Sequence, residues 1–204
     1  MKRFINFILY IILICLFVIL FISLKNINND TVGYIKVNNT NINYPVVQTT
    51  NNTYYLSHTF DKSENKAGWV FMDYRNHNDS FDTNTILYAH GRLDNTMFGS
   101  LRKAVKEEWY TNPDNYIIQY SNDYYSTKWQ VFSVYKVRET DDYIKTNFNS
   151  NNEYQEFIDL IKNRSIYNFN TDITINDKIL TLSSCYNDDY RMVLHAKLVK
   201  IVKK

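Results

Sequence analysis

Apolar residues along most of the chain alternate with polar ones or form short clusters, as they do in β-strands. Gly and Pro are scarce between these segments, so the turns must depend mainly on the side chains of Asn, Asp and Ser. The pattern predicts strands over residues 33–37, 42–48, 68–74, 85–90, 116–120, 129–137, 178–184 and 191–202.

The period of two also predicts which side chains share one face of a strand. Two strands carry a mainly apolar face of this kind. Its members are Trp129, Val131, Tyr135 and Val137 in one strand, and Met192, Leu194, Ala196 and Leu198 in the last. We expect each set to lie on one side of its strand.

After residue 150 the spacing of apolar residues changes to that of a helix. Ser150 and Glu153 form a capping-box pattern, which is typical of a helix start. The apolar stripe that follows is made of Tyr154, Phe157, Ile158 and Ile161. An amphipathic helix is therefore predicted over residues 151–163. The spacing over residues 97–105 predicts another helix, and residues 51–60 can hold a short helical turn.

About eight short strands with two or three inserted helices predict a mainly β fold, a closed or nearly closed β-barrel with peripheral helices. The longest of these helices precedes the last two strands. Strand order does not follow from the pattern.

The N-terminus differs from the rest of the chain. Lys2 and Arg3 precede 21 residues, Phe4 to Leu24, that carry no charge. A helix of about 20 apolar residues spans a bilayer, and the flanking positive charges favour a cytoplasmic N-terminus. We predict a cytoplasmic tip and transmembrane anchor over residues 1–25, a linker over 26–32 and an extracellular domain over 33–204. A cleaved signal peptide is the alternative.

Charge excludes some function classes. The formal net charge is +2, and no block of Lys or Arg occurs outside the termini, so a nucleic-acid partner is not expected. No two histidines have the spacing of a zinc site, and no metal or other cofactor is predicted.

The chain has two cysteines, and Cys15 lies in the apolar N-terminal run. Cys185 is therefore the only thiol of the predicted domain, which cannot form an internal disulfide. A lone thiol facing an oxidising exterior favours a reactive role. A buried, inert cysteine is the other interpretation.

Residues 181–185 end an apolar strand in this thiol, and Arg191 opens the next strand. Strands joined by so short a loop are expected to pair as a hairpin, which brings Cys185 and Arg191 to the same rim. By alternation Ser183 shares a face with Cys185, and Tyr88 shares one with His90. Ser183 and Tyr88 are thus candidate groove residues.

A thiol, an imidazole and a guanidinium form a workable set for acyl transfer. A thiolate at Cys185 attacks a carbonyl, His90 protonates the leaving amine, and Arg191 balances the charge of the oxyanion. A nearby cation also lowers the pKa of a cysteine thiol and raises its reactive fraction.

The sequences Thr-Leu-Ser-Ser-Cys185 and Leu-Tyr-Ala-His90-Gly91, with Arg191 downstream, resemble the sortase family over residues 33–204. Further stretches look like class B of that family. They are Asn41-Ile-Asn-Tyr-Pro-Val-Val-Gln48, Phe71-Met-Asp-Tyr-Arg75, Thr96-Met-Phe98 and Asp142-Tyr-Ile-Lys-Thr-Asn-Phe148. The family pattern often has Thr where this chain has Ser184.

The resemblance implies the sortase β-barrel and a cysteine transpeptidase that needs no cofactor. Such an enzyme cleaves a sorting signal of a surface protein (Asn-Pro-x-Thr or a related Pro-x-Thr motif), forms a thioester, and passes it to a peptidoglycan amine. His90, Cys185 and Arg191 carry over as the triad. The residues implied in substrate binding are Asn52, Leu56, Tyr88, Ser183 and, through its backbone amide, Tyr186.

Three alternatives stay open: a thiol hydrolase of cell-wall peptides, a non-catalytic anchored binding barrel, and a sortase that polymerises pilins. Residues 26–33 are too short for the lid segment that many pilin polymerases carry, which favours wall anchoring. His195, on the last strand, is interpreted as structural or as a surface residue.

Overall fold

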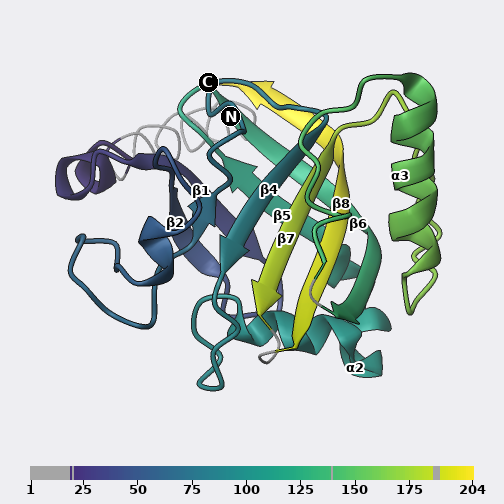
Figure 1. Cartoon of the computed structure of the whole chain (residues 1–204), viewed down its shortest axis with the longest axis horizontal. Coiled ribbons are helices and arrows are strands. Elements are labelled where there is room, and N and C mark those ends of the chain that lie inside the picture. Colours follow the sequence, from purple (N-terminus) through teal and green to yellow (C-terminus); the bar gives the residue numbers. More distant parts are fainter. Residues whose placement is uncertain (1–18, 20, 139, 186–188) are drawn as a thin grey trace, which may run out of the picture.

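The computed structural model describes residue 19 and residues 21–138, 140–185 and 189–204, with the backbone alone for Cys185. In this part of the chain eight strands close into one barrel, in the spatial order β1, β2, β3, β4, β7, β8, β6, β5 (Figure 1). The strands are β1 (Thr31–Val37), β2 (Asn43–Val47), β3 (Phe71–Met72), β4 (Asn84–Ala89), β5 (Ile117–Ser121), β6 (Tyr125–Arg138), β7 (Ile179–Cys185) and β8 (Tyr190–Lys203). The predicted closed barrel is confirmed.

Helical elements lie between the strands and around the barrel. They are η1 (Tyr54–Leu56), η2 (Gly99–Val105), α2 (Glu107–Tyr110), η3 (Pro113–Tyr116) and α3 (Asn151–Asn163). The turn predicted within residues 51–60 is therefore present as η1. Helix α3 stands outside the barrel beside β6 (Figure 1), in the predicted place before the last two strands.

Helix α3 begins where it was predicted to begin and buries the predicted side chains. The Ser150 hydroxyl accepts a hydrogen bond from the Glu153 amide at 3.2 Å, while the Glu153 carboxylate accepts from the Asn149 amide at 2.7 Å. The stripe of Tyr154, Phe157, Ile158 and Ile161 is buried. Together with Phe132, Tyr135, Ile179 and Val193 it forms a hydrophobic cluster between the helix and the outer face of the barrel.

Strand β6 contributes to two cores, so the prediction of one shared apolar face was wrong. Trp129 and Val131 pack inside the barrel, whereas Tyr135 and Val137 pack on the outer side, in the cluster under α3. The register of β6 against β8 shifts between Val131 and Ser133. Such a bulge reverses the alternation of every later residue. In β8, by contrast, the predicted face of Met192, Leu194, Ala196 and Leu198 does line the interior.

The strand predicted over residues 68–74 is reduced to the two residues of β3. The Asp73 carboxylate accepts a hydrogen bond from the Arg75 amide at 2.9 Å, and the Asp73 carbonyl accepts from the Asn76 amide at 3.0 Å. These bonds turn the chain directly after Met72. The hydrogen bonds of Asp73 therefore end the strand at Met72, earlier than the sequence pattern predicted.

The helix predicted over residues 97–105 is a 3-10 helix, η2, that begins at Gly99. Its buried apolar side chains, together with Phe98 before it, recur every three residues: Phe98, Leu101 and Ala104. Three residues per turn is the period of a 3-10 helix, which places all three on one side.

The predicted membrane span, Phe4 to Leu24, lies almost entirely outside the described residues. Among the residues that the structure does describe, no helix has both the length and the apolar character needed to cross a membrane.

Candidate active site

The three predicted catalytic residues lie at the ends of three adjacent strands. Strands β4 and β7 are parallel neighbours in which Ala89 pairs with Ser184, so His90 and Cys185 follow at the same end of the two strands. Strands β7 and β8 are antiparallel, and Cys185 pairs directly with Arg191. The expected hairpin is confirmed, and the three backbone positions meet at one rim of the barrel.

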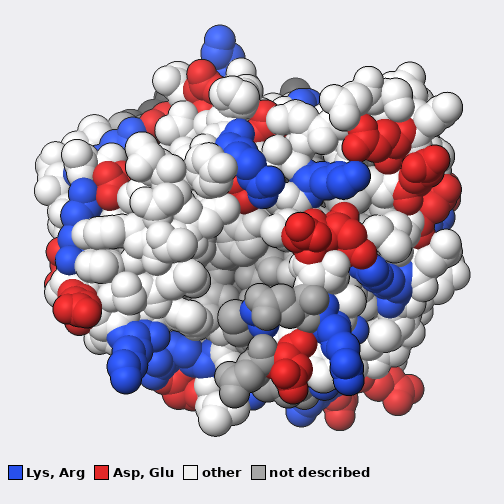
Figure 2. Space-filling view, viewed as in Figure 1, with Lys and Arg blue, Asp and Glu red and all other residues white. Residues whose placement is uncertain are grey.

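A groove of about 280 Å³ opens beside this rim and includes His90 and Arg191 in its walls. Figure 2 shows a hollow near the middle of this face, with Lys and Arg mixed among Asp and Glu around it. The remaining lining residues are Asn52, Leu56, Phe71, Tyr88, Ala89, Thr140, Tyr143, Ile144 and Ser183. All four predicted groove residues of the described chain, Asn52, Leu56, Tyr88 and Ser183, are among them. Tyr186 and the Cys185 side chain lie outside the described residues.

His90 is half-buried and held by the segment that carries Leu56. Its ring nitrogen Nε2 lies 2.7 Å from the Leu56 carbonyl oxygen. Because a carbonyl oxygen only accepts, Nε2 carries the proton in this contact. Gly68 adjoins the same ring: its φ is +60°, and a Cβ there would lie 3.0 Å from His90 Cδ2 and 2.5 Å from the Tyr55 carbonyl oxygen. Glycine is therefore required where the chain passes His90.

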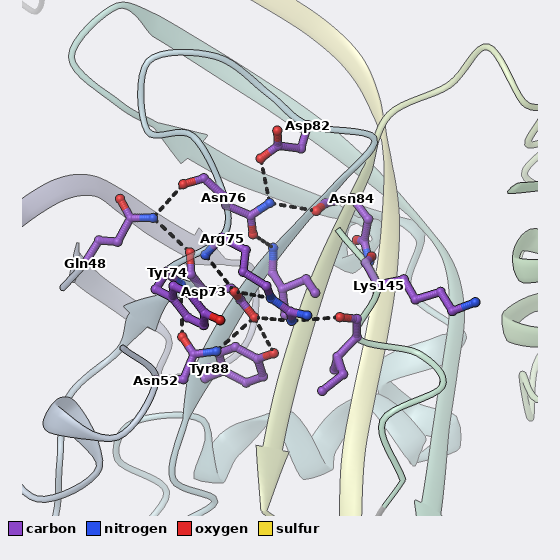
Figure 3. Close-up of polar contacts among 12 residues, drawn as sticks. Gln48, Asn52, Asp73, Tyr74, Arg75, Asn76, Asp82, Asn84, Tyr88 and Lys145 are labelled. Atoms are coloured by element: carbon purple, nitrogen blue, oxygen red, sulfur yellow. Dashed lines mark hydrogen bonds and ion pairs between the residues drawn. The ribbon is translucent and has the colours of Figure 1, made fainter. Parts of the chain in front are cut away.

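Hydrogen bonds to Asp73 connect two other groove residues (Figure 3). The Tyr88 hydroxyl donates to Asp73 Oδ2 at 2.9 Å, and Asn52 Nδ2 donates to the same oxygen at 3.0 Å. Burial, with the adjacent Asp73 carboxylate, raises the pKa of the Tyr88 hydroxyl well above its usual range. Tyr88 is therefore a neutral phenol at physiological pH.

A sequence model of the sortase domain matches residues 35–199. This chain belongs to the sortase family. Sortase B of Staphylococcus aureus is 41% identical over 186 residues, which are 89% of this chain and 75% of that protein.

Solved sortase B structures share the fold of this sortase. The Staphylococcus aureus sortase B–substrate complex is 41% identical with a TM-score of 0.82, and the alignment covers 88% of this chain and 84% of that one. A crystal structure of sortase B complexed with triglycine is 40% identical with a TM-score of 0.83, over 88% and 85% of the two chains. The resemblance to class B is thus confirmed, and the chain is a sortase of the cysteine transpeptidase type.

One wall of the sortase groove was not predicted from the sequence. Thr140, Tyr143 and Ile144 follow β6 and line the groove together with Tyr88. The Tyr143 and Ser183 hydroxyls lie 2.9 Å apart and share a hydrogen bond, which ties this wall to β7. The stretch from Asp142 already resembled the family, but no spacing in the sequence brings it next to Ser183.

His195 lies away from the groove, which agrees with its structural interpretation. It is fully buried on β8, where Nε2 is 2.9 Å from the Tyr135 hydroxyl and Nδ1 is 2.8 Å from the Thr181 hydroxyl. Burial, and to a smaller extent the charge of Arg164, lowers the pKa of His195 to about 3. This imidazole is therefore neutral at physiological pH.

A larger hollow of about 730 Å³ lies between α3 and residues 165–172, and none of the predicted site residues that the structure describes lines it. Its walls are mainly the polar side chains and backbone of the segment that follows α3. The site of this sortase is therefore assigned to the smaller groove at the strand ends, where a thiol, an imidazole and a guanidinium can cooperate in acyl transfer.

Proposed function

We propose that this sortase is a class B enzyme that cleaves an Asn-Pro-x-Thr or related Pro-x-Thr sorting motif and transfers the surface protein to a peptidoglycan amine. The single observation that carries the proposal is the convergence of His90, Cys185 and Arg191 on three adjacent strand ends beside one groove. A groove next to a nucleophile is what a peptide-cleaving transferase requires.

In the proposed mechanism the Cys185 thiolate attacks the backbone carbonyl carbon of the motif's Thr. Arg191 and the backbone amide of Tyr186 stabilise the oxyanion, and the C–N bond breaks as His90 gives a proton to the leaving amine. The thioester then reacts with an incoming amine, which gives a proton to His90, expels Cys185 as the thiolate and forms a new amide bond. Asn52, Leu56, Tyr88 and Ser183 bind the motif.

Two relatives support the assignment of partners. One sortase B structure contains a substrate and another contains triglycine, a peptide with a free amino group. By analogy, the acyl donor of this sortase is a sorting-signal peptide, and the acceptor is an amine of the peptidoglycan cross-bridge or its precursor.

Residues 1–25 are proposed to anchor the enzyme in the cell membrane as a single span, with the catalytic domain, residues 33–204, outside. The support is the uncharged run after Lys2 and Arg3. This arrangement places the groove on the side of the membrane where surface proteins and peptidoglycan meet.

Product analysis in the presence of competing acceptors tests the proposed function. The full-length enzyme is incubated with a panel of Pro-x-Thr peptides and with short amines such as triglycine, and the products are identified by mass spectrometry. We expect the new amide to exceed the hydrolysed peptide once amine is present. Hydrolysis unaffected by any amine would instead indicate a thiol hydrolase, and preference for a lysine side chain of a pilin would indicate a pilin polymerase.

A further inference from the structure

One buried carboxylate is hydrogen-bonded to residues that line the groove and connects them to a further segment of the groove lining. Asp73 directly follows β3, and its side chain has no exposed surface. Its Oδ2 accepts hydrogen bonds from Asn52 Nδ2 at 3.0 Å, from the Tyr88 hydroxyl at 2.9 Å and from Arg75 Nη2 at 2.7 Å. Two residues that line the groove are therefore bound to one oxygen atom (Figure 3).

Arg75 extends this arrangement to the groove wall that follows β6. Its Nε and backbone amide donate to Asp73 Oδ1 at 2.8 and 2.9 Å, which completes a two-pronged ion pair with the carboxylate. Its Nη2 also donates to the Ile144 carbonyl oxygen at 2.9 Å. Ile144 belongs to the wall that follows β6, so a continuous chain of hydrogen bonds joins Tyr88 on β4 to Ile144 in that wall.

The charge of Asp73 suits this role. Burial by itself raises the pKa of the Asp73 carboxyl, but the hydrogen bonds from Arg75 and Tyr88 outweigh burial, and the net pKa lies below its usual range. The group is ionised at physiological pH and can only accept hydrogen bonds. The side-chain groups of Asn52, Tyr88 and Arg75 that contact Asp73 therefore act as hydrogen-bond donors.

That constraint determines what Tyr88 and Asn52 offer to a peptide. Because the Tyr88 hydroxyl donates its proton to Asp73, its oxygen can only accept a hydrogen bond from a ligand. Asn52 is fixed in one of its two amide orientations, since Nδ2 donates to Asp73 while Oδ1 accepts from the Tyr74 amide at 2.9 Å. A peptide whose N–H groups face Tyr88 fits this pattern of donors and acceptors.

We propose that Asp73 is the positioning residue of the groove: it orients Tyr88 and Asn52 toward the sorting motif and, through Arg75, sets the position of the Ile144 wall. The inference rests on the proposed function, because it assumes that a peptide occupies the groove. Asp73 acts through its neighbours and does not itself contact the reacting atoms.

The test compares Asp73→Asn with the wild type in the full-length enzyme, using the sorting peptide that the wild type processes best. Asparagine keeps the size of the side chain but removes the charge and replaces one acceptor oxygen by an NH2 donor. The donors on the two oxygens can then no longer all be satisfied, and either Tyr88 and Asn52 or the Nε and backbone amide of Arg75 face an NH2 group. We expect KM to rise at least about tenfold and kcat to change by less than about threefold, because ground-state and transition-state binding are lost together.

The matched control is Asp82→Asn, in the same segment between β3 and β4. Asp82 accepts hydrogen bonds from the side chain of Asn76 and the backbone of His77, neither of which lines the groove. A merely structural role of the loop predicts that both variants lose thermal stability without a specific change in KM. We expect the wild-type KM for Asp82→Asn.

A double-mutant cycle with Tyr88→Phe measures whether Asp73 acts through Tyr88. If it does, the effects of Asp73→Asn and Tyr88→Phe on kcat/KM are not multiplicative, and the double variant is little worse than Asp73→Asn alone. Multiplicative effects, or an unchanged KM in Asp73→Asn, would overturn the inference while the proposed function stands. If the wild type turns over no Pro-x-Thr peptide, the proposed function fails and the inference fails with it.

Arg75→Lys provides a second variant if Asp73→Asn does not fold. Its side chain is 39% exposed, and lysine keeps the charge beside Asp73 but cannot bind that carboxylate in two-pronged fashion while also reaching the Ile144 carbonyl oxygen. We expect a severalfold rise in KM with kcat nearly unchanged. A wild-type KM in a folded Arg75→Lys enzyme would overturn the bridge between the two walls.

Discussion

At the scale of single residues, the proposed chemistry depends on where strands end. His90 follows the last residue of β4, Cys185 is the last residue of β7, and Arg191 lies at the start of β8. Backbone pairing places Cys185 opposite Arg191, whatever the conformation of their side chains. Backbone hydrogen bonds between β7 and β8 thus bring the residues that carry the guanidinium and the thiol to one rim, without any hydrogen bond from the two side chains.

Replacing Arg191 by lysine distinguishes two roles for the guanidinium. Lysine keeps the positive charge but loses the planar array of donors. If Arg191 stabilises the oxyanion through directed hydrogen bonds, kcat/KM should fall roughly 100- to 1,000-fold, the usual cost of losing such a donor. The measurement is kcat/KM across pH, with the fold checked by thermal melting.

The opposite result for Arg191→Lys has a clear meaning. If the guanidinium only lowers the pKa of the Cys185 thiol by its charge, lysine should retain most of the activity, and any loss should shrink as the pH approaches about 8.5, the pKa of a free thiol. Near-wild-type activity at neutral pH would refute the oxyanion role and leave the roles of Cys185 and His90 untouched.

His195 predicts how stability depends on pH. Its pKa is about 3 in the folded state, against about 6.5 in an unfolded chain, so the unfolded state binds a proton that the folded state excludes. This contribution to stability is complete above pH 6.5 and is lost as the pH falls toward 3. Between pH 7.5 and pH 5 we expect the free energy of unfolding to drop by about 2 kcal/mol from this group.

The variant His195→Gln isolates that effect. Glutamine has no proton to gain in this range, so the difference between the two pH slopes in urea unfolding removes the contributions of the other titrating groups. A slope that is the same in wild type and His195→Gln would show that His195 is protonated in the folded state or exposed to solvent.

At the scale of elements, local signals predicted helix α3 better than any other feature. A capping residue, an acidic first turn and an apolar stripe all occur within a short segment, so the helix depends little on distant parts of the chain. The two faces of β6 could not be predicted in the same way. The shift after Val131 is set by pairing with β8, which lies far along the chain.

Truncation of Phe157 tests how α3 contributes to stability. Its ring is 4% exposed and packs beside Phe148 at a centroid distance of 4.8 Å. Phe157→Ala should reduce the free energy of unfolding by about 3 to 5 kcal/mol, as expected for an aromatic side chain lost from a core. Glu156→Ala, at the neighbouring exposed residue, is the control and should change the free energy of unfolding by less than about 0.5 kcal/mol. Equal stability of the two variants would mean that the helix does not pack on the barrel.

At the scale of the whole molecule, barrel closure assembles the groove from segments that no local pattern connects. Alternation along the strands predicted that Tyr88 lies on the same face as His90, and Ser183 on the same face as Cys185. The parallel pairing of β4 with β7 places Tyr88 beside Ser183. Asp73 gave no such signal, because a single aspartate after a strand usually forms a turn. Its contacts with Asn52 and Tyr88 exist only once β3 lies beside β4.

Intact-mass spectrometry of the enzyme determines whether Cys185 carries the acyl group during transfer. Enzyme and sorting peptide are mixed without an amine acceptor and quenched in acid. We predict a covalent adduct with the mass of the peptide's N-terminal fragment, located on Cys185, released by hydroxylamine and absent from Cys185→Ala. Cleavage of the peptide by Cys185→Ala, or an adduct on any other residue, would show that Cys185 is not the nucleophile.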